Sequence, residues 1–470
     1  DPAIKDYRPA QKPKLQPACQ QRVAEGMEVK SESSDHVSEA RGAVQELLLL
    51  NHPVDCPICD QAGECRLQDY WLEHQGKGKR MHDEPVHKPK AQVFGPTIVY
   101  DGERCIVCTR CVRFCEEVAK DPVLDVRERG NLNEIVVSPG RQLDHGYTLM
   151  TEYVCPVGAL TATDFRFKAR VWFLRSARSV CQGCATGCNA FLDYDPRNET
   201  VYRHRPRENL KVNKYWMCDE GMLDYARAHE DRFISAYVGE DEVSLEAAVK
   251  AAAKALKGVD PERVAIVLSA QHSSEDNFPL LPLARDFLGS GNLFISGKPE
   301  GEGDNVLKHA DKNPNTKGVE QLCSTTPPAS MPQLLEAVAA GKITHAIALG
   351  SAAPGDVDGL SSLKKLVLIS PFDGPLAGYA DVLLPAATWA ESTGTFVNFA
   401  GLAQESERAV RPEQDARPAW KLIAAVGREL GYAMDWQRLS DVRLAMAPDA
   451  GAAVAGGAAA AVSAPTGAGE

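Results

Sequence analysis

The chain has 470 residues, and its 44% hydrophobic and 25% charged residues are typical of a soluble globular protein with two to four domains. The formal net charge of −12 argues against a nucleic-acid partner, which normally requires a basic face. No apolar run is long enough to cross a bilayer, and the polar opening "DPAIKDYRPAQKPK" is not a secretory signal.

The first 65 residues combine a polar leader, one helix and a cluster of possible metal ligands. Residues 1–37 are polar and Pro-rich, and an amphipathic helix is predicted over 38–50. The helix is followed by the pattern H-x3-C-x2-C-x5-C, formed by His52, Cys56, Cys59 and Cys65. Four such ligands on a short loop can hold one zinc ion or one iron–sulfur cluster, and this group alone does not decide between them.

A predicted strand over 97–105 leads into the second cysteine group, "CIVCTRC". Three thiols at C-x2-C-x2-C spacing, with a distant cysteine followed by proline, are the ferredoxin pattern for a [4Fe–4S] cluster. Zinc sites instead favour two separated pairs of ligands. The sequence therefore predicts a [4Fe–4S] site made by Cys105, Cys108, Cys111 and Cys155.

Cys115 offers an alternative fourth ligand, because "CIVCTRCVRFC" also fits C-x2-C-x2-C-x3-C. In two-cluster ferredoxins the last cysteine of that run binds the other cluster, whose own triplet should lie near Cys155. No such triplet is present in the sequence. We therefore expect Cys155 to be the ligand and Cys115 to be a packed free thiol.

The third group follows a predicted strand over 169–174. "CQGCATGC" supplies Cys181, Cys184 and Cys188, and Cys218 in "YWMCDEG" completes a closed site of four thiols. A structural zinc ribbon is the alternative interpretation. Beside the second group, a further [4Fe–4S] cluster in an electron chain is the favoured one. Without an export signal, thiolates that bind metal explain the clustered cysteines better than disulfides do.

After Cys218 the pattern changes to short apolar runs that alternate with helical patterns. This alternation predicts an α/β domain with a parallel sheet. The predicted strands cover 263–269, 292–296, 344–350, 365–370 and 379–385, and the predicted helices cover 244–258, 330–342 and 418–431. The glycines of "GKPEGEGDN" (297–305) do not form a dinucleotide-binding fingerprint, and the Ala/Gly tail 447–470 is predicted to be disordered.

Taken together, these motifs resemble the large, G-type iron–sulfur subunit of NADH–quinone oxidoreductase, respiratory complex I. "NHPVDCPICDQAGEC" is similar to its His–Cys loop, "CIVCTRC" with "CPVGAL" to its second cluster site, and "CQGCATGC" with Cys218 to a third site found in some members. "YADVLLPAATWAESTGTFVNFAGLAQ" (379–404) is similar to a molybdopterin-oxidoreductase domain, which is a relic without molybdenum in that family. The resemblance covers roughly residues 10–435.

The resemblance implies α+β ferredoxin-like iron–sulfur domains followed by an α/β molybdopterin-oxidoreductase-like domain. The expected division is 1–37 (remnant of a [2Fe–2S] domain), 38–95 (His–Cys [4Fe–4S]), 96–168 (ferredoxin-like [4Fe–4S]), 169–226 ([4Fe–4S] of the Mo/W bis-MGD type), 227–446 (shortened molybdopterin-oxidoreductase-like) and 447–470 (tail). Cys19 would be the last ligand of a [2Fe–2S] cluster whose other ligands lie upstream, and the start at Asp1 favours a truncated N-terminus.

The function implied is single-electron relay from a flavin-bearing NADH-oxidising subunit toward a quinone-reducing module. Three [4Fe–4S] clusters, no molybdopterin and no acid–base catalytic site are expected. The complex would be membrane-bound, with this subunit peripheral on the cytoplasmic side of the inner membrane. Two rivals remain at this point: an electron-input subunit of a formate dehydrogenase-like or hydrogenase-like enzyme, and a structural zinc protein.

Overall fold

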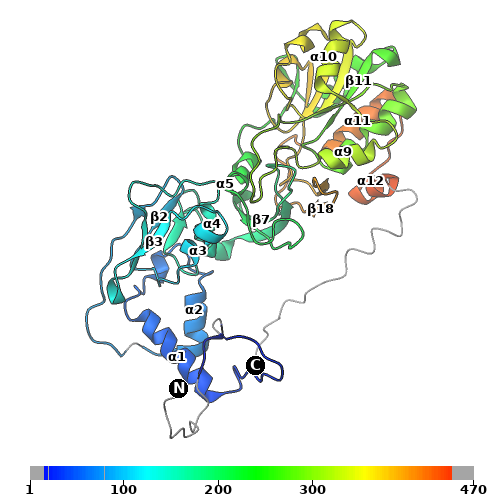
Figure 1. Cartoon of the computed structure of the whole chain (residues 1–470). Coiled ribbons are helices and arrows are strands. Elements are labelled where there is room, and N and C mark those ends of the chain that lie inside the picture. Colours follow the sequence, from blue (N-terminus) through cyan, green and yellow to red (C-terminus); the bar gives the residue numbers. More distant parts are fainter. Residues whose placement is uncertain (1–14, 19–20, 79, 447–470) are drawn as a thin grey trace.

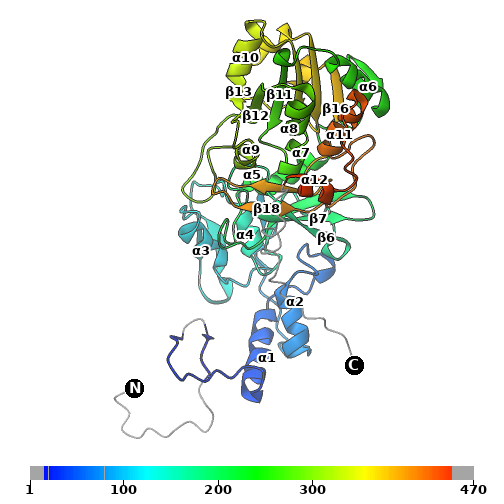
Figure 2. The same cartoon turned by 90° about the vertical axis from the view of Figure 1, so that its right-hand side faces the viewer.

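The structure, a computed structural model, describes residues 15–18, 21–78 and 80–446. Its first helix, α1 (Asp35–Leu49), begins three residues before the predicted start, because Ser34 is extended and the acidic Asp35 suits the first turn. Helix α2 (Arg66–Tyr70) continues as the π-helical turn η3 (Trp71–Gln75), which packs against α1 (Figure 2). Gly76 ends this turn with a φ of 58°.

The segment around the second cysteine group is a small α+β unit. Its three-stranded antiparallel sheet has the order β1-β2-β5, and β3 and β4 form a separate hairpin. The predicted strand over 97–105 is confirmed as β2, and all three of its residues are buried. The elements are β1 (Gln92–Val93), β2 (Ile98–Tyr100), α3 (Arg110–Glu117), β3 (Leu124–Arg127), β4 (Glu134–Val137), α4 (Leu149–Val154) and β5 (Leu160–Ala162).

The third cysteine group lies on an antiparallel sheet of β6 (Arg175–Val180), β7 (Asn189–Asp195) and β8 (Thr200–Pro206), followed by α5 (Asp219–Leu223). The strand predicted over 169–174 is wrong, because Val171–Phe173 form a 3-10 turn and the strand begins at Arg175. This stretch packs instead on the first cysteine loop: the Arg170 guanidinium donates to the carbonyl of Cys59 over 2.7 Å, and Val171 and Trp172 contact Gly63.

The α/β domain contains an eight-stranded sheet with the order β10-β9-β16-β15-β14-β11-β12-β13. The strands from β11 to β16 are parallel, as predicted, and β9 and β10 add an antiparallel edge. The strands are β9 (Ala236–Val238), β10 (Asp241–Val243), β11 (Val264–Ser269), β12 (Leu293–Ser296), β13 (Ala329–Ser330), β14 (His345–Leu349), β15 (Lys365–Ser370) and β16 (Val382–Pro385). The chain order reverses between β11 and β14, so a topological switch point lies there.

Helices cover both faces of this sheet, which explains why its strands are almost uniformly apolar. One core lies under α6 and α11 and the other under α10, and these three helices confirm the predicted ones. The helices are α6 (Leu245–Leu256), α7 (Ser274–Asn277), α8 (Leu280–Pro282), α9 (Thr316–Leu322), α10 (Met331–Ala339), α11 (Ala419–Leu430) and α12 (Leu439–Met446). No helix in the described ranges combines the length and the apolar character needed to span a membrane.

Figure 1 shows the blue and cyan cysteine-bearing segments at one end of the molecule and the α/β domain at the other. The hairpin of β17 (Gly394–Val397) and β18 (Ala403–Ser406) reaches from the α/β domain to β6. The Gln404 amide donates to the carbonyl of Gly187 over 2.9 Å, and the Glu407 N–H donates to the carbonyl of Arg178 over 2.7 Å. The hairpin therefore holds the third cysteine group against the α/β domain.

Candidate iron–sulfur centres

The second cysteine group surrounds a single small cavity. Cys105 follows β2, Cys111 lies on α3, and Cys155 stands at the end of α4. The loop that carries the first two thiols is tightly coiled, with positive φ at Val107 and Thr109, a conformation that non-glycine residues rarely adopt. The cavity is lined by Cys105, Cys108, Cys111, Cys155, Tyr100, Ile106, Thr109, Arg110, Ile135, Pro156, Val157, Ala159 and Leu160.

The pocket between these thiols is lined largely by apolar atoms; Cys111 is buried, Cys105 and Cys155 are half-buried, and Cys108 is exposed. Burial raises the pKa of Cys155 to about 12, and it also raises the pKa of Cys111. The N–H of Val107 donates to the sulfur of Cys105 over 3.3 Å. Four thiols around one apolar pocket fit the donor set of a [4Fe–4S] cluster, whose potential depends on burial and on hydrogen bonds to sulfur.

Cys115 lies outside this cavity. Cys115 lies on α3 with its side chain fully buried in the core, and its sulfur is 3.5 Å from Nε2 of His145. Burial raises its pKa to about 12. The structure thus gathers the predicted set with Cys155 and leaves Cys115 as a packed thiol.

The third group also surrounds one small cavity. Its ligand loop closes on itself, because the Cys181 N–H donates to the carbonyl of Cys188 over 2.9 Å. Gly221 packs against these sulfurs so closely that a Cβ there would lie 2.9 Å from Sγ of Cys181. The lining residues are Cys181, Gly183, Cys184, Cys188, Met217, Cys218, Glu220, Gly221, Leu307, Lys308 and Lys312.

The cysteines of the first group lie on one loop, from the 3-10 turn Cys56–Ile58 to the start of α2 at Cys65. Burial raises the pKa of Cys65, and the neighbouring Cys56 adds to the effect. Gly158, which comes shortly after Cys155 of the second group, packs against Cys59. A Cβ at Gly158 would clash with the sulfur of Cys59. This loop is therefore fitted tightly onto the second site.

His52 lies near the second cysteine group. It lines a cavity that also contains Cys105 of the second group, and its Nδ1 is buried without a hydrogen-bond partner among the described residues. Burial lowers the pKa of His52, so the ring is neutral at pH 7 and keeps a lone pair available to a metal. The structure thus places His52 in one pocket with Cys105, and its role as a ligand of the first group stays a prediction.

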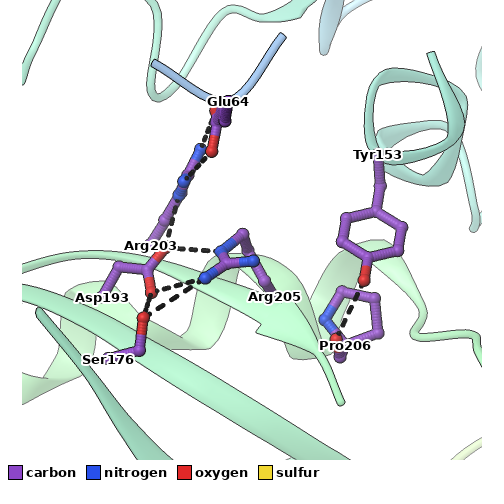
Figure 3. Close-up of polar contacts among 7 residues, drawn as sticks. All are labelled: Glu64, Tyr153, Ser176, Asp193, Arg203, Arg205 and Pro206. Carbon is purple, nitrogen blue, oxygen red and sulfur yellow. Dashed lines mark hydrogen bonds and ion pairs between the residues drawn. The ribbon is translucent and has the colours of Figure 1, made fainter. Parts of the chain in front are cut away.

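An ionic network that the sequence did not reveal ties the first loop to the third segment (Figure 3). The Arg203 guanidinium donates to both carboxylate oxygens of Glu64, over 3.0 and 2.7 Å, and to Asp193 over 2.7 Å. Arg205 and Ser176 also donate to Asp193, over 2.5 and 2.6 Å. Since Glu64 precedes the candidate ligand Cys65, the network fixes the first loop on β7 and β8.

Two cysteines remain outside these three groups and the Cys115 core. Cys19 lies outside the described residues, and Cys323 is fully buried in the core of the α/β domain. Within the part of the chain that the structure describes, no three His, Cys, Asp or Glu side chains are spaced to hold a single metal ion.

A cavity larger than those of the second and third cysteine groups, of about 170 Å³, lies at the carboxyl ends of β11, β14, β15 and β16, at the switch point of the sheet. It is lined by Gln182, Lys298, His272 and Trp389, among others. Nε2 of His272 and Nε1 of Trp389 are buried without a hydrogen-bond partner in the described structure. No thiol belongs to its described lining.

Three family models match successive parts of the chain. The iron–sulfur binding region of NADH-ubiquinone oxidoreductase-G matches residues 41–80, and the ferredoxin-like domain of NADH-quinone oxidoreductase subunit 3 matches residues 95–161. Molybdopterin oxidoreductase matches residues 245–429. The predicted fold class is thereby confirmed: iron–sulfur domains followed by a molybdopterin-oxidoreductase-like α/β domain.

Individual relatives agree with these matches. The G subunit of NADH-quinone oxidoreductase from Streptomyces coelicolor is 36% identical over 233 residues, which are 49% of this chain and 27% of the relative. The G subunit from Rickettsia conorii is 34% identical over 288 residues, or 60% of this chain and 42% of the relative. NADH-quinone oxidoreductase subunit 3 of Thermus thermophilus is 34% identical over 290 residues, or 58% of this chain and 36% of the relative. The aligned region thus spans less than half of each relative.

Two solved structures align more loosely. Acetylene hydratase from Pelobacter acetylenicus is 11% identical over 56% of this chain and 70% of that chain, with a TM-score of 0.41. An NAD+-reducing [NiFe]-hydrogenase in the H2-reduced state is 26% identical over 29% of this chain and 60% of that chain, with a TM-score of 0.26. On the sequence matches, the iron–sulfur region of the chain is similar to NADH-quinone oxidoreductase G subunits, and the region behind it is similar to molybdopterin oxidoreductases.

Proposed function

We propose that this chain is an electron-transfer subunit that relays single electrons in an NADH-quinone oxidoreductase. The observation that carries the proposal is the gathering of Cys105, Cys108, Cys111 and Cys155 around one apolar cavity, although Cys155 comes 44 positions after Cys111. A bound [4Fe–4S] cluster takes up and releases one electron at a time. The chain's own contribution is to bind such clusters, keep water from them and set their potentials.

Each of the three groups has a proposed ligand set. The first cluster would be held by His52, Cys56, Cys59 and Cys65, the second by Cys105, Cys108, Cys111 and Cys155, and the third by Cys181, Cys184, Cys188 and Cys218. A neutral histidine in place of a thiolate removes one negative charge, so the first site should have the higher potential for its type. A [2Fe–2S] cluster at Cys19 would require ligands from residues upstream of this chain.

The partners and location follow from the same proposal. Electrons would enter from a flavin-bearing NADH-oxidising subunit and leave toward a quinone-reducing module. The chain would be a peripheral part of a membrane-bound complex on the cytoplasmic side of the inner membrane. It would have no acid–base catalytic site of its own and no molybdopterin.

The first experiment is chemical analysis of protein purified without oxygen. We expect a brown protein with iron and acid-labile sulfide for three [4Fe–4S] clusters, and electron paramagnetic resonance (EPR) signals that appear on reduction. Since zinc–thiolate sites are colourless, stoichiometric zinc with little iron would refute the electron-relay proposal and favour a structural zinc protein.

A further inference from the structure

The loop that follows β12 has a position that its sequence did not suggest. It begins with "GKPEGEGDN" (297–305), which is not a nucleotide-binding fingerprint, and continues as "VLKHADKN" (306–313). Although it belongs to the α/β domain, it extends to the third cysteine group. There Leu307, Lys308 and Lys312 line the same cavity as the four thiols.

Hydrogen bonds fix this loop, residues 297–313, on the iron–sulfur segments. The Ala185 N–H donates to the carbonyl of Asp311 over 2.8 Å, and the Thr186 hydroxyl donates to the carbonyl of Leu307 over 2.6 Å. On the other side, the Tyr147 hydroxyl donates to Asp304 over 2.5 Å. Leu307 also packs against the core that contains Cys181 and Cys188. These contacts hold the loop 297–313 against the segment that carries Cys181, Cys184 and Cys188.

The charges that the loop brings to the cavity are positive. Nζ of Lys312 donates to the carbonyl of Glu302 over 2.6 Å, and it forms no ion pair with a carboxylate in the described residues. Nζ of Lys308 lies 2.5 Å from a carboxylate oxygen of Glu220, which also lines the cavity. The Lys308 side chain is 19% exposed and that of Glu220 is 65% exposed, so the cation is the less hydrated charge of this pair.

We propose that the loop 297–313 covers the third cluster and that Lys308 and Lys312 raise its reduction potential. The inference rests on the proposed function, because it requires a cluster at the third cysteine group. One-electron reduction adds a negative charge to the site, and a nearby cation held out of water stabilises the reduced form. Leu307 would exclude water from the same side. The two lysines act on the cluster through their positive charge and do not bind iron.

The test is an EPR-monitored redox titration of the purified protein with dithionite and mediators. The signal of the third cluster is identified as the one lost in Cys184→Ala. We expect Lys312→Gln to lower the potential of the third cluster by at least about 59 mV, which corresponds to a tenfold change in the one-electron equilibrium constant. Lys312→Arg should leave this potential unchanged. Glu220→Gln should shift it the opposite way, because it removes the anion that neutralises Lys308.

Lys317→Gln is the matched control, since Lys317 lies in α9 just after the loop and pairs with the exposed Glu320 instead of facing the cavity. Its third-cluster potential should equal that of the unmodified protein. Unchanged potentials in both Lys312→Gln and Glu220→Gln, in protein that retains iron for three clusters, would overturn this inference alone. Iron for only two clusters in the unmodified protein would overturn the third site and the inference with it.

Discussion

Replacing Cys155 by Ala should remove one cluster, whereas replacing Cys115 by Ala should keep all of them. Cys155 lines the cavity of the second group, and Cys115 is packed in the core against His145. Losing a covalent ligand opens the second site, so iron content should fall by one [4Fe–4S] equivalent. Cys115→Ala should cost only packing free energy, about 1–2 kcal/mol. Iron analysis and thermal unfolding of both variants measure the two effects.

The reverse outcome, with iron lost in Cys115→Ala and retained in Cys155→Ala, would show that the fourth ligand is wrongly assigned. A third outcome is also informative: loss in both variants would mean that the core around Cys115 is needed to hold α3 in place. Protein levels and circular dichroism would separate that case from ligand loss.

A second residue-scale prediction concerns His52. Replacing it by Cys should keep the first cluster and lower its potential by on the order of 100 mV, because a thiolate adds a negative charge that neutral imidazole lacks. His82→Cys, at an exposed loop position, is the control and should leave every potential unchanged. An unchanged first-cluster potential in His52→Cys would indicate that His52 does not ligate iron, as its place beside Cys105 allows.

At the scale of elements, the network around Asp193 should be the main interaction that holds the first loop on β7 and β8. The Asp193 side chain is 2% exposed and the Arg203 side chain is 10% exposed. Asp193→Asn removes the carboxylate that the buried Arg203 and the half-buried Arg205 share, and it should lower the free energy of unfolding by about 3–5 kcal/mol. The exposed pair of Glu246 and Lys250 supplies the control, since Glu246→Gln should change stability by less than about 0.5 kcal/mol.

Asp193 should also affect how the stability of the protein falls at acidic pH. Burial disfavours the carboxylate, but Arg205 and Arg203 outweigh it and hold the pKa of Asp193 below its usual range. A depressed folded-state pKa contributes stability that is present above the unfolded value of 3.8 and is lost as pH falls through the folded pKa. Asp193→Asn should therefore flatten the loss of thermal stability below about pH 4, which melting curves at several pH values would show. If the melting temperature of Asp193→Asn fell with decreasing pH as steeply as that of the unmodified protein, Asp193 would not be the group responsible.

Local patterns predicted most of the elements because burial on both faces of a parallel sheet leaves continuous apolar strands. The runs at 264–269 and 365–370 are such strands. The run at 169–174 is similarly rich in apolar residues, yet it forms a turn because its side chains pack on Gly63 and the first cysteine loop. A short apolar run does not by itself distinguish a strand from a turn buried by a distant segment.

At the scale of the whole molecule, spacing predicted which thiols gather but not what surrounds them. Cys108 and Cys111 meet because the coiled loop between β2 and α3 is local. Cys181 and Lys312 line the same cavity although they lie far apart in the chain. No local sequence pattern indicates that they come together. The link between Glu64 and Arg203 is equally distant, and in the sequence both are ordinary surface-type charges. Such contacts depend on domain packing, which local sequence patterns do not encode.

The α/β domain should contain no bound pterin or molybdenum, although its sequence matches the molybdopterin oxidoreductases. The cavity at the switch point is the place where such a sheet binds ligands, and the unpartnered nitrogens of His272 and Trp389 belong to residues that line it. Its described lining offers no thiol to a metal, since Cys323 is fully buried in the core.

The measurement is to denature the purified protein, oxidise the extract, and assay pterin fluorescence together with molybdenum and tungsten by mass spectrometry. We expect neither pterin nor metal at stoichiometric levels, because no thiol belongs to the described lining of this cavity to bind the metal. Protein from cells grown with added molybdate and tungstate is the control against limited supply. A stoichiometric signal from that protein would make the chain part of a formate dehydrogenase-like enzyme, in which the third cluster would serve the pterin site instead of a path toward quinone.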